Sequence, residues 1–206
     1  MVSRQDYLNK INVFPVPDGD TGTNMAFTLS SILENTASMI HKRVDLMLMR
    51  VADAAIDGAR GNSGAILAQF FQGLSDGTAD VDKHSPESFS KALNLGAQYA
   101  KEALSEPMEG TILTVITDFS NEINSSLSKK NNDFIHLFEI GLKKAEESLK
   151  NTPNLLPILK KSGVVDSGAQ GFVDLLNGIN LFIKSGSIKT TNKITLSISD
   201  LSLIHI

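Results

Sequence analysis

Apolar residues that recur every three or four positions dominate this chain of 206 residues. Such spacing places them along one face of an α-helix, and that face must be buried against other helices. Seven segments of this kind precede residue 186, at about 23–36, 44–58, 64–74, 89–103, 112–127, 134–149 and 172–183. None of the chain before residue 186 carries a firm strand pattern. We therefore predict an all-α fold, either an antiparallel helical bundle or a closed helical barrel, with the apolar faces as its core.

Local signals at several helix boundaries agree with this prediction. Ser85 followed by Pro86 is typical of an N-cap with proline at the first helical position. Gly73, Gly77 and Gly163 lie where helices are expected to stop. The helices should therefore be joined by short connections.

The pattern changes towards the end of the chain. Ile194, Leu196 and Ile198 alternate with polar residues, which is the period of a strand rather than a helix. We expect residues 1–186 to form the helical domain. Residues 187–206 are expected to be a linker or a non-native tail.

Composition excludes several classes of function. The chain has 19 Lys+Arg against 23 Asp+Glu, a net charge of −4, and no basic run, so no nucleic-acid partner is expected. The absence of cysteine excludes disulfides, thiolate metal sites and cysteine catalysis. No apolar stretch approaches ~20 residues and no leader sequence opens the chain, so we expect a cytoplasmic protein without a transmembrane segment.

The segment that begins at Asn12, NVFPVPDGDTGTNM, carries the strongest chemical signal. Its prolines delay the next helix until after Pro17. Asp18 and Asp20 flank a glycine, so the backbone can bring the two carboxylates together, where they repel each other unless a cation lies between them. Such hard oxygen ligands suit Mg²⁺. The alternative is an Asx-rich turn that caps the next helix.

A second glycine-rich corner, GARGNSG, lies between two predicted helices at residues 58–64. Its glycines allow close approach of a ligand, and the free N–H groups of the following helix start form an anion site. Arg60 adds a cation that phosphate oxygens can bind. The alternative is a glycine C-cap followed by an Asn62 N-cap.

Two further helix starts, at Thr111 and near Asp166, fit either the same picture or simple capping. From the residues alone, a helical protein with a magnesium and phosphate site and a helical protein with well-capped corners both remain open.

The order of four segments is more specific than any one of them. NVFPVPDGDTGTNM, GARGNSGAIL, EGTILTV and NTPNLLPILKKSGVVDSGAQG together closely resemble the N-terminal, DhaL-like nucleotide domain of the bacterial fatty acid kinase ATP-binding subunit. The family also includes the L subunit of dihydroxyacetone kinase. The resemblance runs from residue 12 to about residue 184. It implies a barrel of eight antiparallel helices with a Mg–nucleotide site at one end. Because only seven helices are predicted here and only eleven residues precede the motif, we expect an N-terminally truncated domain that lacks the first helix.

The resemblance also assigns roles to individual residues. It implies magnesium ligation by Asp18, Asp20 and Asn12, and charge neutralisation during catalysis by Asp18, Asp20 and Arg60. The implied nucleotide-binding residues are Thr21, Thr23, Asn24, Gly61, Asn62, Ser63, Gly64, Thr111, Asp166 and Gly168. Thr21 stands where dihydroxyacetone kinases carry histidine, which favours the fatty acid kinase branch.

The implied reaction moves the γ-phosphoryl group of ATP to a fatty acid carboxylate held by a separate fatty-acid-binding protein. A carboxylic acid with a pKa near ~4.3 is already ionised at neutral pH, so the reaction needs no general base. Two alternatives stay open: a dihydroxyacetone-kinase-like phosphotransferase, and a non-catalytic module that only binds Mg–nucleotide. The resemblance also implies further domains of a larger subunit, without which this chain alone need not be active.

Overall fold

Every regular element in the described chain is a helix. The computed structural model describes residues 2–38, 40–127 and 133–186. Seven long helices are α2 (Thr21–Thr36), α3 (Val44–Gly58), α4 (Gly61–Asp76), α5 (Pro86–Glu102), α6 (Ile112–Ser126), α7 (Phe134–Leu155) and α9 (Ser167–Ser185). Three short ones are a 3₁₀-helix (Val2–Arg4), α1 (Gln5–Lys10) and α8 (Pro157–Ser162). The all-α prediction is confirmed, and the predicted tail at 187–206 lies outside the described residues.

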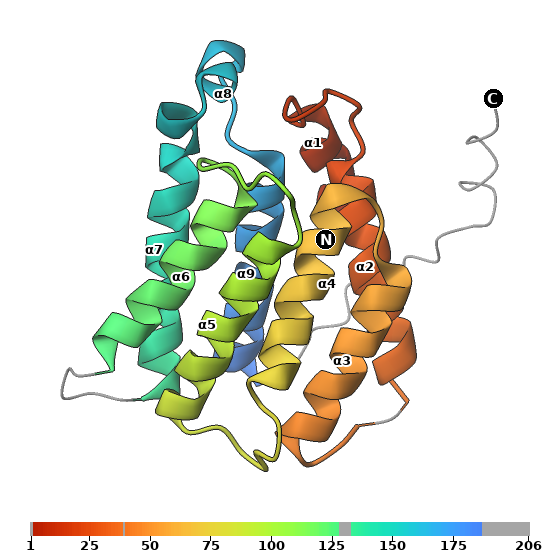
Figure 1. Cartoon of the computed structure of the whole chain (residues 1–206), viewed down its shortest axis with the longest axis vertical. Coiled ribbons are helices and arrows are strands. Elements are labelled where there is room, and N and C mark those ends of the chain that lie inside the picture. The colour runs from red at the N-terminus through yellow and green to blue at the C-terminus, as the bar shows by residue number, and fades with distance from the viewer. Residues whose placement is uncertain (1, 39, 128–132, 187–206) are drawn as a thin grey trace.

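The long helices form a closed antiparallel ring (Figure 1). Each of α2 to α7 packs on the next, and α9 packs on α6, α7 and α2, which closes the ring. Phe172 of α9 fills the interior, with its ring edge-to-face against Phe70 of α4 at 5.4 Å and Phe119 of α6 at 6.0 Å between centroids. Because neighbouring helices alternate in direction, α2, α4, α6 and α9 all begin at the same end, the upper end in Figure 1.

Two of the three glycines predicted to stop helices do so, and the prediction for Gly73 is wrong. Gly77 follows α4 as its C-cap, and Gly163 ends α8 in the left-handed conformation. Gly73 lies inside α4, where a Cβ atom would come within 2.5 Å of the Leu95 carbonyl oxygen and 2.7 Å of Gly96 Cα. Its role is therefore to let α4 and α5 cross at close range.

The predicted boundaries differ most where helices are short or interrupted. Six residues show no apolar period, so α1 and α8 escaped the sequence analysis. The helix predicted to end at 149 continues to Leu155 although it contains Pro153, which offers no N–H to the Leu149 carbonyl. The hydroxyl of Thr152 donates to that carbonyl instead, at 2.8 Å, so the carbonyl stays paired as the helix continues.

The helices that close the ring carry exposed apolar side chains. Leu33 of α2 is 67% exposed, and Ile179 and Phe182 of α9 are also exposed. The six-residue α1 packs against both α2 and α9. That the first helix of the family's eight-helix barrel is missing from this chain stays a prediction. Within the described residues, no helix is both long and apolar enough to cross a bilayer.

Candidate functional site

A pocket of about 670 Å³ opens at the end of the ring where α2, α4, α6 and α9 begin. Its wall is contributed by the loop before α2, the starts of these four helices and the α5–α6 loop. Eleven of the predicted site residues line it: Asn12, Asp18, Asp20, Thr21, Asn24, Gly61, Asn62, Ser63, Thr111, Asp166 and Gly168. The ring thus brings together segments that lie up to about 150 residues apart in the sequence.

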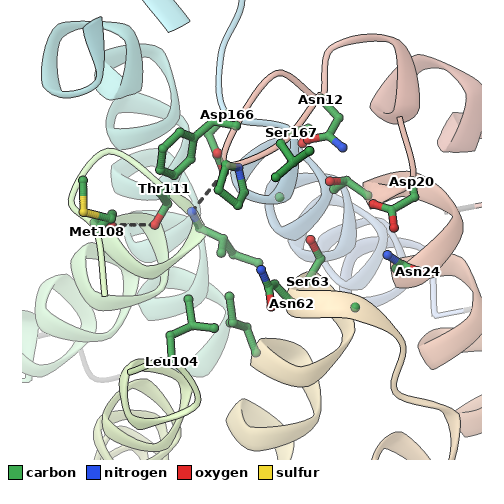
Figure 2. A pocket seen from close by; sticks show the side chains of 18 of the residues that line it. Asn12, Asp20, Asn24, Asn62, Ser63, Leu104, Met108, Thr111, Asp166 and Ser167 are labelled. Carbon is green, nitrogen blue, oxygen red and sulfur yellow. Dashed lines mark hydrogen bonds between the residues drawn. The ribbon is translucent and has the colours of Figure 1, made fainter. Parts of the chain in front are cut away.

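The loop before α2, residues 11–20, carries an unpaired polar atom at the pocket, and we call it the acidic loop. The side chain of Asn12 is 5% exposed and its Nδ2 donates to Asp18 Oδ1 at 2.7 Å. Its Oδ1 is buried and has no hydrogen-bond partner in the described part of the protein. A buried amide oxygen without a donor is costly, and a bound cation would satisfy it. In Figure 2, Asn12 and Asp20 lie on the same side of the pocket.

One side of the pocket presents helix starts without side-chain caps. We call it the open wall: Asp18, Asp20, Thr21, Asn24, Gly61, Asn62 and Ser63. Neither Asp20 before α2 nor Arg60 before α4 makes a side-chain cap hydrogen bond. Gly61 has a φ of +54°, and a Cβ atom there would overlap the Asn24 amide. Asn9 Oδ1 takes the Thr23 N–H of α2, but no N-cap side chain takes the N–H groups of Thr21 and Gly22 in α2 or of Gly61 and Asn62 in α4. These N–H groups can face an anion.

Three predicted site residues, all within the described part, do not line the pocket. Thr23 faces α1, where its N–H donates to Asn9 Oδ1 at 3.1 Å and its hydroxyl accepts from Asn9 Nδ2 at 2.9 Å. Gly64 lies inside α4, where a Cβ atom would come within 2.8 Å of Thr28 Oγ1 of α2. Arg60 is exposed and donates to the Ala59 carbonyl at 2.7 Å.

On the opposite side of the pocket, both helix starts carry side-chain caps. We call this side the capped wall: Thr111, Ile112, Asp166, Ser167 and Gly168. Asp166 Oδ1 accepts from Ile112 N at 3.0 Å and from Ala169 N at 2.8 Å, so one carboxylate caps both α6 and α9. Thr111 Oγ1 caps Leu113 N at 3.3 Å and donates to the Met108 carbonyl at 2.7 Å. Figure 2 shows Thr111 and Asp166 facing the pocket from this side.

Burial dominates the electrostatics of Asp166. Desolvation raises the pKa of its carboxyl from the ordinary 3.8 to about 6, although backbone N–H bonds from Ala169, Ile112 and Gly168 oppose the rise. Asp166 is 5% exposed. The carboxylates of the open wall are more accessible to solvent than this one.

Comparison with known proteins assigns the chain to a family. The model of the DAK2 domain matches residues 15–180. The chain belongs to the DAK2 domain family. It is therefore similar to the nucleotide-binding L subunit of dihydroxyacetone kinase, and the family is associated with kinase function.

The curated relatives of this DAK2 domain are longer proteins. An uncharacterised protein of Staphylococcus saprophyticus is 38% identical over 183 residues, which cover 89% of this chain and 33% of the relative. An uncharacterised protein of Staphylococcus aureus is 38% identical over 186 residues, with the same coverage of each chain. The chain thus spans about a third of the length of the curated relatives that it matches.

The sequence analysis missed the apolar part of the DAK2 pocket. Leu104 and Met108 lie in the α5–α6 loop, Ile66 lies in α4, and Phe14 and Val16 lie in the acidic loop. Phe14, Val16 and Ile66 belong to segments that the sequence analysis singled out, but for their acidic, proline and glycine residues. Leu104 and Met108 fall between two helical repeats, where apolar residues carry no periodic signal.

Proposed function

We propose that this pocket binds Mg²⁺–ATP and that the domain transfers the γ-phosphoryl group to a fatty acid carboxylate presented by a lipid-binding partner. The proposal rests on the negative charge of the pocket. Its lining contains the carboxyl groups of Asp18, Asp20, Glu106 and Asp166 and, among the described residues, no lysine or arginine. A nucleoside triphosphate would be repelled from such a pocket unless a cation accompanied it.

The donor set of the acidic loop fits magnesium. Asp18 and Asp20 offer carboxylate oxygens, and Asn12 Oδ1 offers a buried amide oxygen that lacks a donor. No cluster of three or more acidic or histidine side chains forms a metal cage within the described ranges. Mg²⁺ tolerates so few protein ligands because it keeps several waters and binds substrate phosphates. When bound, it would neutralise charge on the phosphates.

The two walls divide the nucleotide between them. The N–H groups of Thr21 and Gly22 in α2 and of Gly61 and Asn62 in α4, which no N-cap side chain takes, would bind phosphate oxygens. Gly61 has no side chain to block that approach. The capped wall has no N–H group of this kind left at Ile112 or Ala169. Together with the apolar Leu104 and Met108, it suits the uncharged nucleoside. This arrangement positions the phosphates without a general base.

The choice of acceptor rests on Thr21. It lines the open wall, and it occupies the position at which the resemblance places histidine in dihydroxyacetone kinases. A carboxylate acceptor is already ionised at neutral pH, whereas an alcohol acceptor requires proton removal. Phosphoryl transfer assays with a fatty acid on its carrier protein and with dihydroxyacetone separate these acceptors. Binding without transfer to either would indicate a module that only holds Mg–nucleotide.

The experiment that tests the site compares Asp18→Asn/Asp20→Asn with the unaltered chain by calorimetric titration of ATP in Mg²⁺. We expect the double variant to lose at least roughly 100-fold in affinity, because two charged oxygen ligands disappear together. Asp53→Asn/Asp57→Asn is the matched control, since both residues are exposed on α3 and neither lines the pocket. Equal affinities in the three proteins would overturn the assignment of the acidic loop.

A further inference from the structure

Asp166 makes contacts that an ordinary helix cap does not make. A cap residue usually bonds its own helix, as Asp166 does with Ala169 N. Its Oδ1 also accepts from Ile112 N, which belongs to another helix and lies 54 positions away in the sequence. The pair of bonds ties the starts of α6 and α9 to one buried atom.

The backbone of Asp166 is tied to a third helix. Its N–H donates to Thr152 Oγ1 at 3.1 Å, and Thr152 is fully buried in α7. The same hydroxyl donates to the Leu149 carbonyl. Both the donor and an acceptor site of Thr152 are therefore engaged, and Asp166 is held in place from behind the pocket.

The end of α7, which holds Asp166 through Thr152, also determines the shape of the α5–α6 loop. Gly110 has a φ of +82°, and a Cβ atom there would come within 2.8 Å of Leu155 Cβ and 3.2 Å of the Thr152 carbonyl. The loop therefore rests directly on the end of α7. Thr111, the next residue, donates to the Met108 carbonyl at 2.7 Å. The position of the apolar Met108 at the pocket therefore depends on the position of α7.

We propose, on the basis of the function proposed above, that Asp166 is a positioning residue for the nucleoside. Its carboxylate holds the starts of α6 and α9 at a fixed separation, with Thr152 of α7 as its anchor. Loss of this accepting side-chain oxygen lowers affinity for the nucleoside and leaves binding of the metal-bound phosphates unchanged. Asp166 contributes through the shape of the capped wall, since its Oδ1 is already occupied by two backbone donors.

The test separates the two parts of the ligand. Adenosine, which carries no phosphate, and tripolyphosphate with Mg²⁺ are titrated separately into the chain. We expect Asp166→Ala to weaken adenosine binding by about 10-fold or more and to change tripolyphosphate binding less than about 3-fold. Asp18→Asn/Asp20→Asn should show the reverse pattern. Equal losses for both probes, or no loss for either, in Asp166→Ala would overturn the proposal.

Two gentler variants keep the test decisive should Asp166→Ala not fold. Asp166→Asn retains an oxygen that can accept from Ile112 N and Ala169 N, so it should restore adenosine affinity to within about 3-fold of the unaltered chain. Thr152→Val removes the anchor without touching the pocket lining and should weaken adenosine binding selectively. Thr36→Val is its control, because among the described residues that buried hydroxyl bonds only the Ile32 carbonyl of its own helix. Equal adenosine affinity in the two threonine variants would contradict the anchoring role.

Amide hydrogen exchange distinguishes failure of this inference from failure of the proposed function. In Asp166→Ala, the amides of Ile112 and Ala169 should exchange at least about 10-fold faster, while that of Asn24 in α2 stays unchanged. If the unaltered chain binds neither probe, the proposed function is wrong and the nucleoside role falls with it. Unchanged exchange at Ile112 and Ala169 would show that Asp166 does not hold the wall, whatever the chain binds.

Discussion

The open wall and the capped wall are built from the same parts, yet they offer opposite chemistry. Each consists of two helix starts that face one pocket. In the capped wall, Asp166 accepts from Ile112 N and Ala169 N, and Thr111 accepts from Leu113 N. In the open wall no N-cap side chain caps α2 or α4, and only the Thr23 N–H of α2 meets a side chain, that of Asn9, among the bonds of the described residues. Helix starts therefore do not predict an anion site by themselves, because the residue that precedes the helix decides whether its N–H groups remain available.

The largest expected effect is on the pH dependence of stability, through Asp166 of the capped wall. Burial raises the pKa of Asp166 to about 6, so between about pH 4 and pH 6 the folded state holds a proton that the unfolded state has lost. Stability from this group is fully present below the ordinary pKa of 3.8 and is lost as pH rises through about 6. From pH 4 to pH 7 the unaltered chain should lose about 2 kcal/mol more unfolding free energy than Asp166→Asn.

Urea unfolding at several pH values measures this difference. Asp45→Asn serves as the control, because a hydrogen bond from Arg43 lowers the pKa of Asp45. The stability that Asp45 contributes is present above its ordinary pKa and lost as pH falls, so its pH dependence has the opposite sign. The same pH dependence in Asp166→Asn and the unaltered chain would mean that the carboxylate of the capped wall is not desolvated.

A smaller effect is expected at Gly61, the glycine of the open wall. Its φ of +54° and the overlap of an added Cβ with the Asn24 amide should make Gly61→Ala cost about 1–2 kcal/mol of stability. Displacement of Asn24 should also weaken ATP binding by roughly 10-fold. Gly178→Ala is the control, because a Cβ atom there meets nothing within 4 Å in the middle of α9 and should stabilise the helix by about 0.5–1 kcal/mol.

Thermal unfolding and ATP titration of the two glycine variants check this prediction. Tighter or unchanged ATP binding in Gly61→Ala would break the comparison, since it would mean that the backbone of the open wall does not approach the phosphates.

The smallest effect is expected at Arg60. The side chain is exposed, bonds the neighbouring Ala59 carbonyl and does not line the pocket. Arg60→Gln should therefore change ATP affinity by less than about 3-fold, as surface changes usually do. A loss of more than about 10-fold in calorimetric titration would support the role that the sequence analysis gave to Arg60 and would add a cation to the open wall.

The sequence predicted the parts of the molecule that depend on local pattern. The long helices followed from apolar repeats, and Ser85 was identified as an N-cap, which a capping box with Ser88 confirms. Gly73 was misread because its close contacts are to another helix, and neighbours in the sequence carry no information about such contacts. The contact of Gly64 with α2 could not be predicted for the same reason. The double role of Asp166 was missed for the same reason, since Ile112 lies far from it in the sequence.

The central claim is that this acidic pocket binds a nucleotide only when a cation accompanies it. Calorimetric titration of ATP into the unaltered chain, first with Mg²⁺ and then with EDTA, tests it most directly. The account predicts binding in Mg²⁺ that weakens by at least roughly 100-fold in EDTA. Equal binding of ATP in the two conditions would contradict it, because the carboxylates of the open wall would then face the phosphates with no cation between them.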